Sequence, residues 1–281
     1  MTRVSVVVPA YNNAEYIERT MDSILAQTHT DLEIIVADHA STDSTWQLLQ
    51  KYAADDRVTL LQTEAGGGAL RNWNRVSQEA TEKYLKLVCG DDLIAPTLIE
   101  RQVAALDKNP SSTLSAVSRD IVDANDRPII RNRGLGGMTG LVSGATAIRN
   151  TVISGTNLFG EPACVMLHTD VLKRVGWWDS SYPYLIDEAT YVRVLLEGDL
   201  VAINEPLASF RVSDSQWSVR LARSQASQAA GFHTWLFAQH SVISRADLRR
   251  GNLAALGMAA LRRAAYIVLR RRMKASERAA S

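Results

Sequence analysis

Two adjacent carboxylates, Asp91 and Asp92, follow a mainly apolar run, Leu85–Val88, across Cys89 and Gly90. A short apolar run bounded by glycine predicts a buried strand. Paired acids at the carboxyl end of such a strand suit a hard divalent cation that also binds phosphate oxygens. The same pair would also suit an ordinary turn or a helix cap. The metal interpretation therefore depends on which other residues reach the same edge.

The first half of the chain alternates apolar runs with segments whose apolar residues recur at helical spacing. The runs predict strands at residues 4–8, 32–37, 58–62 and 84–88, and the other segments predict helices after Asn13, after residues 41–44 and after residues 66–68. Strands that alternate with helices in this way form a parallel sheet with right-handed crossovers and helices on both faces. The sequence therefore predicts an α/β fold.

The ends of these strands carry polar and turn-forming residues, and ligands of such sheets bind beyond the carboxyl ends of the strands. The residues in question are Pro9, Ala10, Tyr11, Asn12 and Asp38, followed by the turn Gly66-Gly67-Gly68. The glycine turn is either a phosphate cradle of backbone N–H groups or a flexible connection. Arg71, in the helix that follows, is either a phosphate contact or a surface cation. We expect one crevice that gathers all four strand ends.

The composition is that of a globular protein, and we expect no secretion signal, because the N-terminus lacks a basic segment and a cleavage site. The 281 residues are 46% apolar and 22% charged, and no apolar run approaches the roughly 20 residues of a membrane-spanning helix. Cys89 and Cys164 lack metal-type or redox-type spacing, so reduced thiols are expected. These features predict a cytoplasmic protein.

Charge divides the chain into an acidic body and a basic tail. Residues 218–281 hold twelve Lys or Arg and two acids, whereas residues 1–217 have a net charge of −9. We therefore divide the chain into a domain at 1–217 and a basic helical segment at 218–281. Residues 253–274 combine an apolar stripe with arginines, which indicates contact with an anionic membrane. The alternatives are packing on the acidic body or on a second copy of the chain, as a homodimer. Nucleic-acid binding is not expected, because the tail lacks interleaved aromatic residues.

Two later segments bear on the site. Residues 129–143 are rich in Gly and Arg with little periodicity, which predicts an irregular loop over the crevice. Residues 187–196 predict a helix that begins with two acids, Asp187 and Glu188.

With these strand ends aligned, the chain resembles glycosyltransferase family two over roughly residues 3–215. The matching segments are residues 6–12, 34–43 and 69–72, Gly90-Asp91-Asp92, Gly160-Glu161-Pro162, residues 176–179 and Phe210-Arg211. The resemblance implies the GT-A nucleotide-diphospho-sugar transferase fold.

The resemblance also implies roles for individual acids. Asp38 matches the residue that binds the nucleobase, and Asp91 and Asp92 match the pair that contacts the ribose and binds Mg²⁺ or Mn²⁺. Asp187 or Glu188 falls where the family has its general base. His39 and Cys89 stand where the family often has further acids.

The implied reaction is the inverting transfer of one sugar from a nucleotide-diphosphate donor to a cell-envelope glycan or lipid-linked acceptor. Members that synthesise long polymers carry a Gln-x-x-Arg-Trp motif, and this sequence lacks it. The enzyme would work at the inner face of the plasma membrane. The alternative is a catalytically degenerate nucleotide-sugar-binding or scaffold protein. A sugar-nucleotidyltransferase would need a Gly-rich phosphate loop after the first strand, and residues 9–12 do not provide one.

Overall fold

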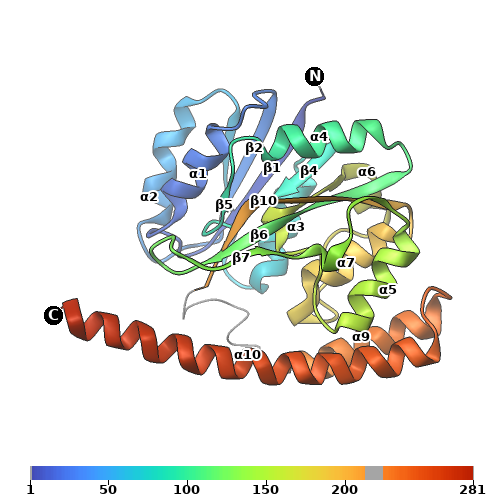
Figure 1. Ribbon diagram of the computed structural model, residues 1–281. Coiled ribbons are helices and arrows are strands. Elements are labelled where there is room, and N and C mark those ends of the chain that lie inside the picture. Colours follow the sequence, from blue (N-terminus) through green and yellow to red (C-terminus); the bar gives the residue numbers. More distant parts are fainter. Residues whose placement is uncertain (1, 213–223, 281) are drawn as a thin grey trace.

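A ten-stranded sheet forms the centre of the molecule, with helices on both sides (Figure 1). The computed structural model describes residues 2–212 and 224–280, with side chains described as far as residue 263. The main strand order is β3-β2-β1-β4-β9-β6-β10-β5, while β7 pairs with β6 and β8 with β10. The sheet is therefore mixed and curled. Its N-terminal, parallel part joins β1 to β4, while β6 and β10 also pair in parallel and the remaining pairs are antiparallel.

The parallel part confirms the strands predicted from apolar runs. It consists of β1 (Val4–Ala10), β2 (Leu32–Asp38), β3 (Val58–Gln62) and β4 (Tyr84–Leu87). Every residue of β1 is buried, as expected for a strand covered on both faces. In the register of β1 with β2, Ala10 lies opposite Asp38, so the two strand ends are level.

The helices of this half are α1 (Ile17–Leu25), α2 (Thr45–Leu49), α3 (Gly68–Gln78) and α4 (Leu98–Lys108). Short 3-10 turns occur at Gln50–Ala54, Leu135–Gly137, Pro162–Cys164 and Pro183–Leu185. The helix predicted after Asn13 begins at Ile17. The Asn13 side chain accepts a hydrogen bond from the backbone N–H of Tyr11 at 2.8 Å, which bends the chain at the end of β1.

The second half of the sheet contains β5 (Leu93–Ile94), β6 (Ser112–Val122), β9 (Val165–His168) and β10 (Asp199–Arg211). The prediction of an irregular loop at 129–143 was wrong, because this region contains β7 (Pro128–Arg133) and β8 (Gly140–Val142). These are edge strands held by antiparallel backbone pairing to β6 and β10. Pairing of that kind needs no apolar alternation, so the sequence pattern did not indicate it.

The remaining helices are α5 (Gly144–Ser154), α6 (Thr169–Arg174), α7 (Ile186–Leu195), α9 (Gln225–Gln239) and α10 (Arg245–Ala280). The predicted division at residue 217 lies outside the described residues. Helix α10 runs along the lower side of the body (Figure 1) and packs on α5 and α9. Gly155 permits this packing, since a Cβ there would lie 2.3 Å from the backbone nitrogen of Ala255. Among the described residues no helix has the length and apolarity to span a bilayer.

Candidate active site

A cavity of about 1220 Å³ opens beyond the carboxyl ends of the parallel strands. Lining residues between 9 and 92, from the strand ends and α3, are named the N-terminal wall. Lining residues between 119 and 262, from β6, β7, α7, β10, α9 and α10, are named the C-terminal wall. The cavity therefore joins the predicted strand ends to helices from the far end of the chain.

Hydrogen bonds between the ends of β1 and β2 fix the N-terminal wall. The backbone N–H of Asn12 donates to the Ser41 hydroxyl at 2.9 Å, and the Asn12 side chain accepts from the N–H of Thr42 at 2.8 Å. Tyr11 and His39, both lining the cavity, place their rings 6.0 Å apart. These bonds hold a rigid edge with an exposed aromatic ring, a surface suited to a flat ligand.

Asn72 fastens α3 to the same edge, and sequence reasoning did not single it out as a site residue. Its amide nitrogen donates to the backbone oxygens of Ala10 and Ala37, at 3.3 and 2.9 Å. Its oxygen accepts from the Thr63 hydroxyl at 2.7 Å. The buried Ala10 thus contributes its carbonyl to the scaffold, while Pro9, Tyr11 and Asn12 line the cavity.

Asp38 lies just beneath the wall, 2% exposed, with its neighbours His39 and Ala40 lining the cavity. One carboxylate oxygen accepts from the backbone N–H of Ser41 at 3.1 Å. The other has no hydrogen-bond partner among the described residues. A buried carboxylate oxygen in this situation is suited to a donor supplied by a ligand, because leaving it unpaired is costly.

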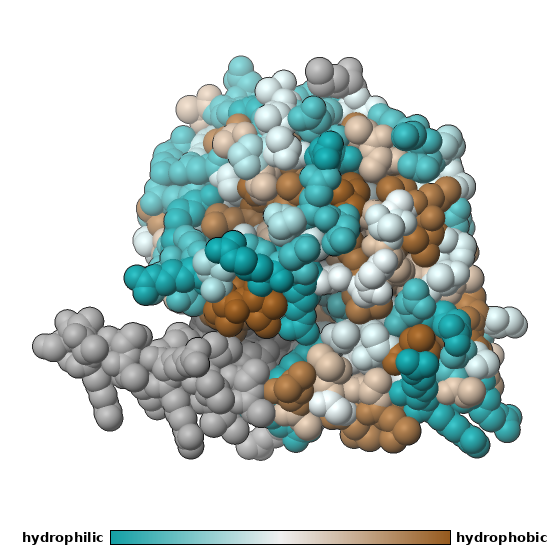
Figure 2. Space-filling view, viewed as in Figure 1, coloured by the Kyte–Doolittle hydropathy of each residue, from teal (hydrophilic) through white to brown (hydrophobic). Residues whose placement is uncertain are grey.

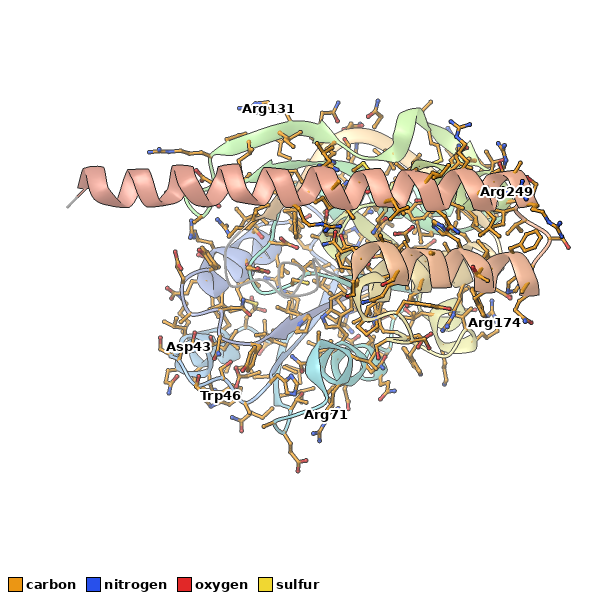
Figure 3. The ribbon with its side chains drawn as sticks, turned by 90° about the horizontal axis from the view of Figure 1, so that it is seen from below. Asp43, Trp46, Arg71, Arg131, Arg174 and Arg249 are labelled. Carbon is orange, nitrogen blue, oxygen red and sulfur yellow. The ribbon has the colours of Figure 1, made fainter. Side chains whose placement is uncertain are left out.

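The glycine turn lies at the cavity, whereas Arg71, in the helix that follows it, is not among the lining residues. Gly66 and Gly68 line the cavity, and Gly67 takes a left-handed conformation (φ 74°) just before α3. Because Gly67 has no Cβ, the Arg71 side chain folds across it to reach the Ala65 carbonyl and the Glu64 carboxylate. Arg71 lies at the edge of the molecule away from α10 (Figure 3). Arg71 is not among the residues that line the cavity, which agrees with the surface-cation alternative.

Asp91 and Asp92 line the cavity together, on a turn held by Arg211. The guanidinium of Arg211 donates to the Asp91 carbonyl at 2.9 Å, and its backbone N–H donates to the Asp92 carboxylate at 3.3 Å. Arg211 is fully buried at the end of β10. The last strand of the sheet thus positions the acidic turn at the end of β4. The sequence had identified Arg211 only as part of a motif.

The acidic turn fits a divalent cation that arrives with phosphate. Burial, followed by the charge of Asp91, raises the pKa of Asp92 well above its ordinary value, and a cation would relieve that repulsion. Within the described part of the chain, no cluster of three or more His, Cys, Asp or Glu could hold a metal. Two carboxylates leave further positions for phosphate oxygens and water, as is usual for Mg²⁺. Burial also raises the pKa of Cys89, so this thiol remains neutral.

Asp187 and Glu188 lie on the C-terminal wall, in the first turn of α7. The Asp187 carboxylate accepts from the Asn157 side chain at 3.0 Å and from the backbone N–H of Glu188 at 2.8 Å. Burial raises the pKa of Asp187 to about 6. Burial and then the charge of Asp187 raise the pKa of Glu188 to about 8. At neutral pH, therefore, Asp187 is mainly ionised and Glu188 mainly protonated.

Three arginines also reach this wall. Arg119, with its side chain 5% exposed, forms a paired ionic contact with Glu161, and one of its hydrogen bonds measures 3.0 Å. Arg133 of β7 and Arg262 of α10 line the cavity as well. Sequence reasoning missed the three arginines and Asn157, because residues that meet from β6, β7, α10 and a loop show no common spacing.

Relatives of the chain carry glycosyltransferase names. The Bacillus subtilis proteins EpsE and TuaG are each 36% identical, over 109 and 101 residues, so the matches span 39% and 40% of their own length. The Escherichia coli protein named UDP-Glc:alpha-D-GlcNAc-diphosphoundecaprenol beta-1,3-glucosyltransferase WfaP is 27% identical over 204 residues. That match covers 70% of this chain and 72% of WfaP.

Solved structures share the fold. Staphylococcus aureus TarS 1-349, in complex with UDP-GlcNAc, superimposes with a TM-score of 0.70 at 19% identity, covering 90% of this chain and 71% of that one. The Pyrobaculum calidifontis mannosyltransferase PcManGT, in complex with GDP-Man and Mn²⁺, gives 0.68 at 19% identity, covering 95% and 75%. The predicted GT-A fold is confirmed. The profile of glycosyl transferase family 2 matches residues 5–176, more than half of the chain. The chain therefore belongs to glycosyl transferase family 2.

Proposed function

We propose that this protein transfers a single sugar from a nucleotide-diphosphate donor to a hydroxyl group of an acceptor, with inversion at the anomeric carbon. One observation carries the proposal: Asp91, Asp92 and Asp187, far apart in the sequence, line one cavity. That arrangement leaves room for a donor between a phosphate-binding edge and a carboxylate that can accept a proton.

The N-terminal wall would bind the nucleotide. Asp38 has an unpaired buried oxygen for a donor group of the base, and Tyr11 provides an aromatic face beside it. Gly66, Gly67 and Gly68 remain the proposed backbone contact for phosphate. Asp91 and Asp92 would hold Mg²⁺ or Mn²⁺, which when bound stabilises the negative charge of the diphosphate leaving group.

Asp187 is the proposed general base. The acceptor oxygen attacks C1 of the sugar, the bond from C1 to the diphosphate oxygen breaks, and Asp187 takes the acceptor proton. Asp187 is preferred over Glu188, because a pKa of about 6 leaves it ionised at neutral pH, whereas a pKa of about 8 leaves Glu188 protonated. Asn157 would hold the Asp187 carboxylate in place.

The proposed acceptor is a cell-envelope glycan or a lipid-linked sugar. The name of the Escherichia coli relative, which includes a diphosphoundecaprenol acceptor, supports this class. Contact of residues 253–274 with an anionic membrane would bring the enzyme to such an acceptor at the inner face of the plasma membrane. Exposed Leu253 and Leu256 on α10 agree with that orientation, or with an interface in a homodimer.

The test is hydrolysis and transfer with uridine, thymidine and guanosine diphosphate sugars in the presence of Mn²⁺. We expect one donor to raise the melting temperature and to be consumed, with consumption lost in EDTA and restored by added Mn²⁺. Binding of a donor without turnover would indicate the degenerate binding protein instead. If no donor raises the melting temperature, with or without metal, the proposed function is wrong.

A further inference from the structure

Arg262 of α10 brings a positive charge into the cavity and makes no ion pair with a described carboxylate, although its charge lowers the pKa of the nearby Glu188. Its guanidinium donates to two neutral hydroxyls, those of Tyr184 at 2.7 Å and Thr156 at 2.6 Å. It also lies over the Tyr184 ring, 5.7 Å from the centroid. The two hydroxyls orient the guanidinium but leave its charge unneutralised. Thr156 precedes Asn157, which holds Asp187, so this charge lies on the side of the proposed base.

Arg133 of β7 adds a second cation of the same kind. It is partly buried and lines the cavity, and its guanidinium makes no hydrogen bond or ion pair to any residue in 2–212 or 224–263. Burial and the charges of Arg119 and Arg262 lower the pKa of Arg133 from its ordinary value, although the charge of Glu161 acts in the opposite direction. Arg133 and Arg262 are therefore close enough to repel each other, and an anion between them would relieve that repulsion.

Arg119 shows that the fold can neutralise an arginine on this wall. Glu161 meets Arg119 with both carboxylate oxygens, in the paired geometry typical of arginine and carboxylate. Among residues 2–212 and 224–263, no carboxylate forms such a pair with Arg133 or Arg262, although both arginines line the same cavity. The difference indicates that their counter-ion comes from a bound molecule.

The mouth of the cavity beside these arginines is apolar. Ile129 and Ile130 of β7 are 40% and 43% exposed, and Leu261, next to Arg262, is 62% exposed; all three line the cavity. Figure 2 shows hydrophobic side chains on β7, bordered by hydrophilic ones. If the anionic group of an acceptor binds the two arginines, the rest of that acceptor would extend out of the cavity over these apolar side chains.

We propose that Arg133 and Arg262 form a phosphate subsite of the acceptor, so that the acceptor is a phosphate-bearing substrate rather than a neutral glycan. The inference rests on the proposed function. Arginine is suited to the role because its fork of N–H donors matches phosphate oxygens. The phosphate could belong to a lipid-linked sugar or to a glycan phosphate, and the two sources share this recognition.

The test measures binding of three probes to the protein saturated with Mn²⁺ and the nucleoside diphosphate of its donor. The probes are dodecyl phosphate, methyl phosphate and the neutral octyl glucoside. We expect Arg133→Gln and Arg262→Gln each to weaken binding of both phosphates about ten- to a hundredfold, the loss of one charge-assisted contact, with no change for octyl glucoside. Tighter binding of dodecyl phosphate than of methyl phosphate would identify the lipid-linked source, and equal binding the glycan source.

Two neighbouring arginines provide matched controls. Arg131, also on β7, is exposed and lies at the outer edge of the molecule (Figure 3), and Arg263 is exposed beside Arg262. Arg131→Gln and Arg263→Gln should bind the phosphates as the wild type does. Arg133→Lys and Arg262→Lys keep the charge and should recover part of the affinity, which separates charge from folding. Phosphate binding that is absent in the wild type, or equal in all variants, would overturn the subsite. A failed donor screen would instead overturn the proposed function.

Discussion

The two walls of the cavity are held together by different kinds of interaction. The N-terminal wall is held by short-range bonds between strand ends, such as those of Asn12 and Asn72, and its residues follow one another at intervals set by the strand–helix repeat. The C-terminal wall is assembled from β6, β7, α7 and α10, and its character is ionic. In the proposed function, the first wall would provide a rigid edge for the nucleotide. The second would provide the charges that bind and activate the acceptor.

The largest effect should come from the proton acceptor on the C-terminal wall. Asp187→Asn removes the proposed base while keeping a side chain of the same size, and general-base catalysis is worth about 10²–10⁴-fold. We therefore expect kcat to fall by that factor while the donor still raises the melting temperature.

Glu188→Gln is the matched control for this change. A protonated glutamate and a glutamine are both neutral and similar in size, so kcat at neutral pH should fall by less than about tenfold. A larger loss in Glu188→Gln than in Asp187→Asn would assign the base to Glu188.

The pH dependence of kcat/KM should follow the titration of Asp187, on the C-terminal wall. Asp187 acts as a base only when ionised, and its pKa is raised to about 6. Below pH 6, kcat/KM should therefore fall about tenfold for each pH unit, while donor binding changes less. The measurement is kcat/KM across the pH range in which the fold stays intact. A flat profile through pH 6 would contradict the assignment.

The sequence predicted the N-terminal wall better than the C-terminal wall. Apolar runs predicted β1 to β4. Because these strands run in the same direction, Asp38 and Asp91 were expected at one edge of the sheet, and the structure shows this parallel pairing. The two alternatives for Arg71 could not be separated from the sequence, because its direction depends on the left-handed turn at Gly67. Arg133 and Arg262 were not predicted, since β7 has no apolar alternation and the docking of α10 depends on a close approach at Gly155.

A substitution in the N-terminal wall should mainly lower the free energy of unfolding. Asn72→Leu would remove the amide partner of the Ala37 carbonyl and of the Thr63 hydroxyl, whereas the Ala10 carbonyl would keep the backbone N–H of His39. Unsatisfied buried groups of this kind cost about 1–3 kcal/mol each, so we expect a loss of about 2–3 kcal/mol in unfolding free energy by urea denaturation. Asn125→Leu, at an exposed turn, should change it by less than about 0.5 kcal/mol. Equal effects would mean that Asn72 does not fasten the wall.

The smallest effect is expected for Arg71→Ala. Its contact with Glu64 is solvent-exposed, and such pairs contribute about 0–1 kcal/mol. The donor KM should stay within about twofold of the wild-type value, because the side chain points away from the cavity. A donor KM raised about tenfold or more would show that Arg71 turns inward to the phosphate when the donor binds.

The most direct test of the central claim is a crystal structure with the donor identified in the screen and Mn²⁺. The account predicts the cation and diphosphate at Asp91 and Asp92, the base beside Asp38, and the anomeric carbon facing Asp187 across the cavity. A donor seated elsewhere, or one whose anomeric carbon is turned away from Asp187, would contradict it.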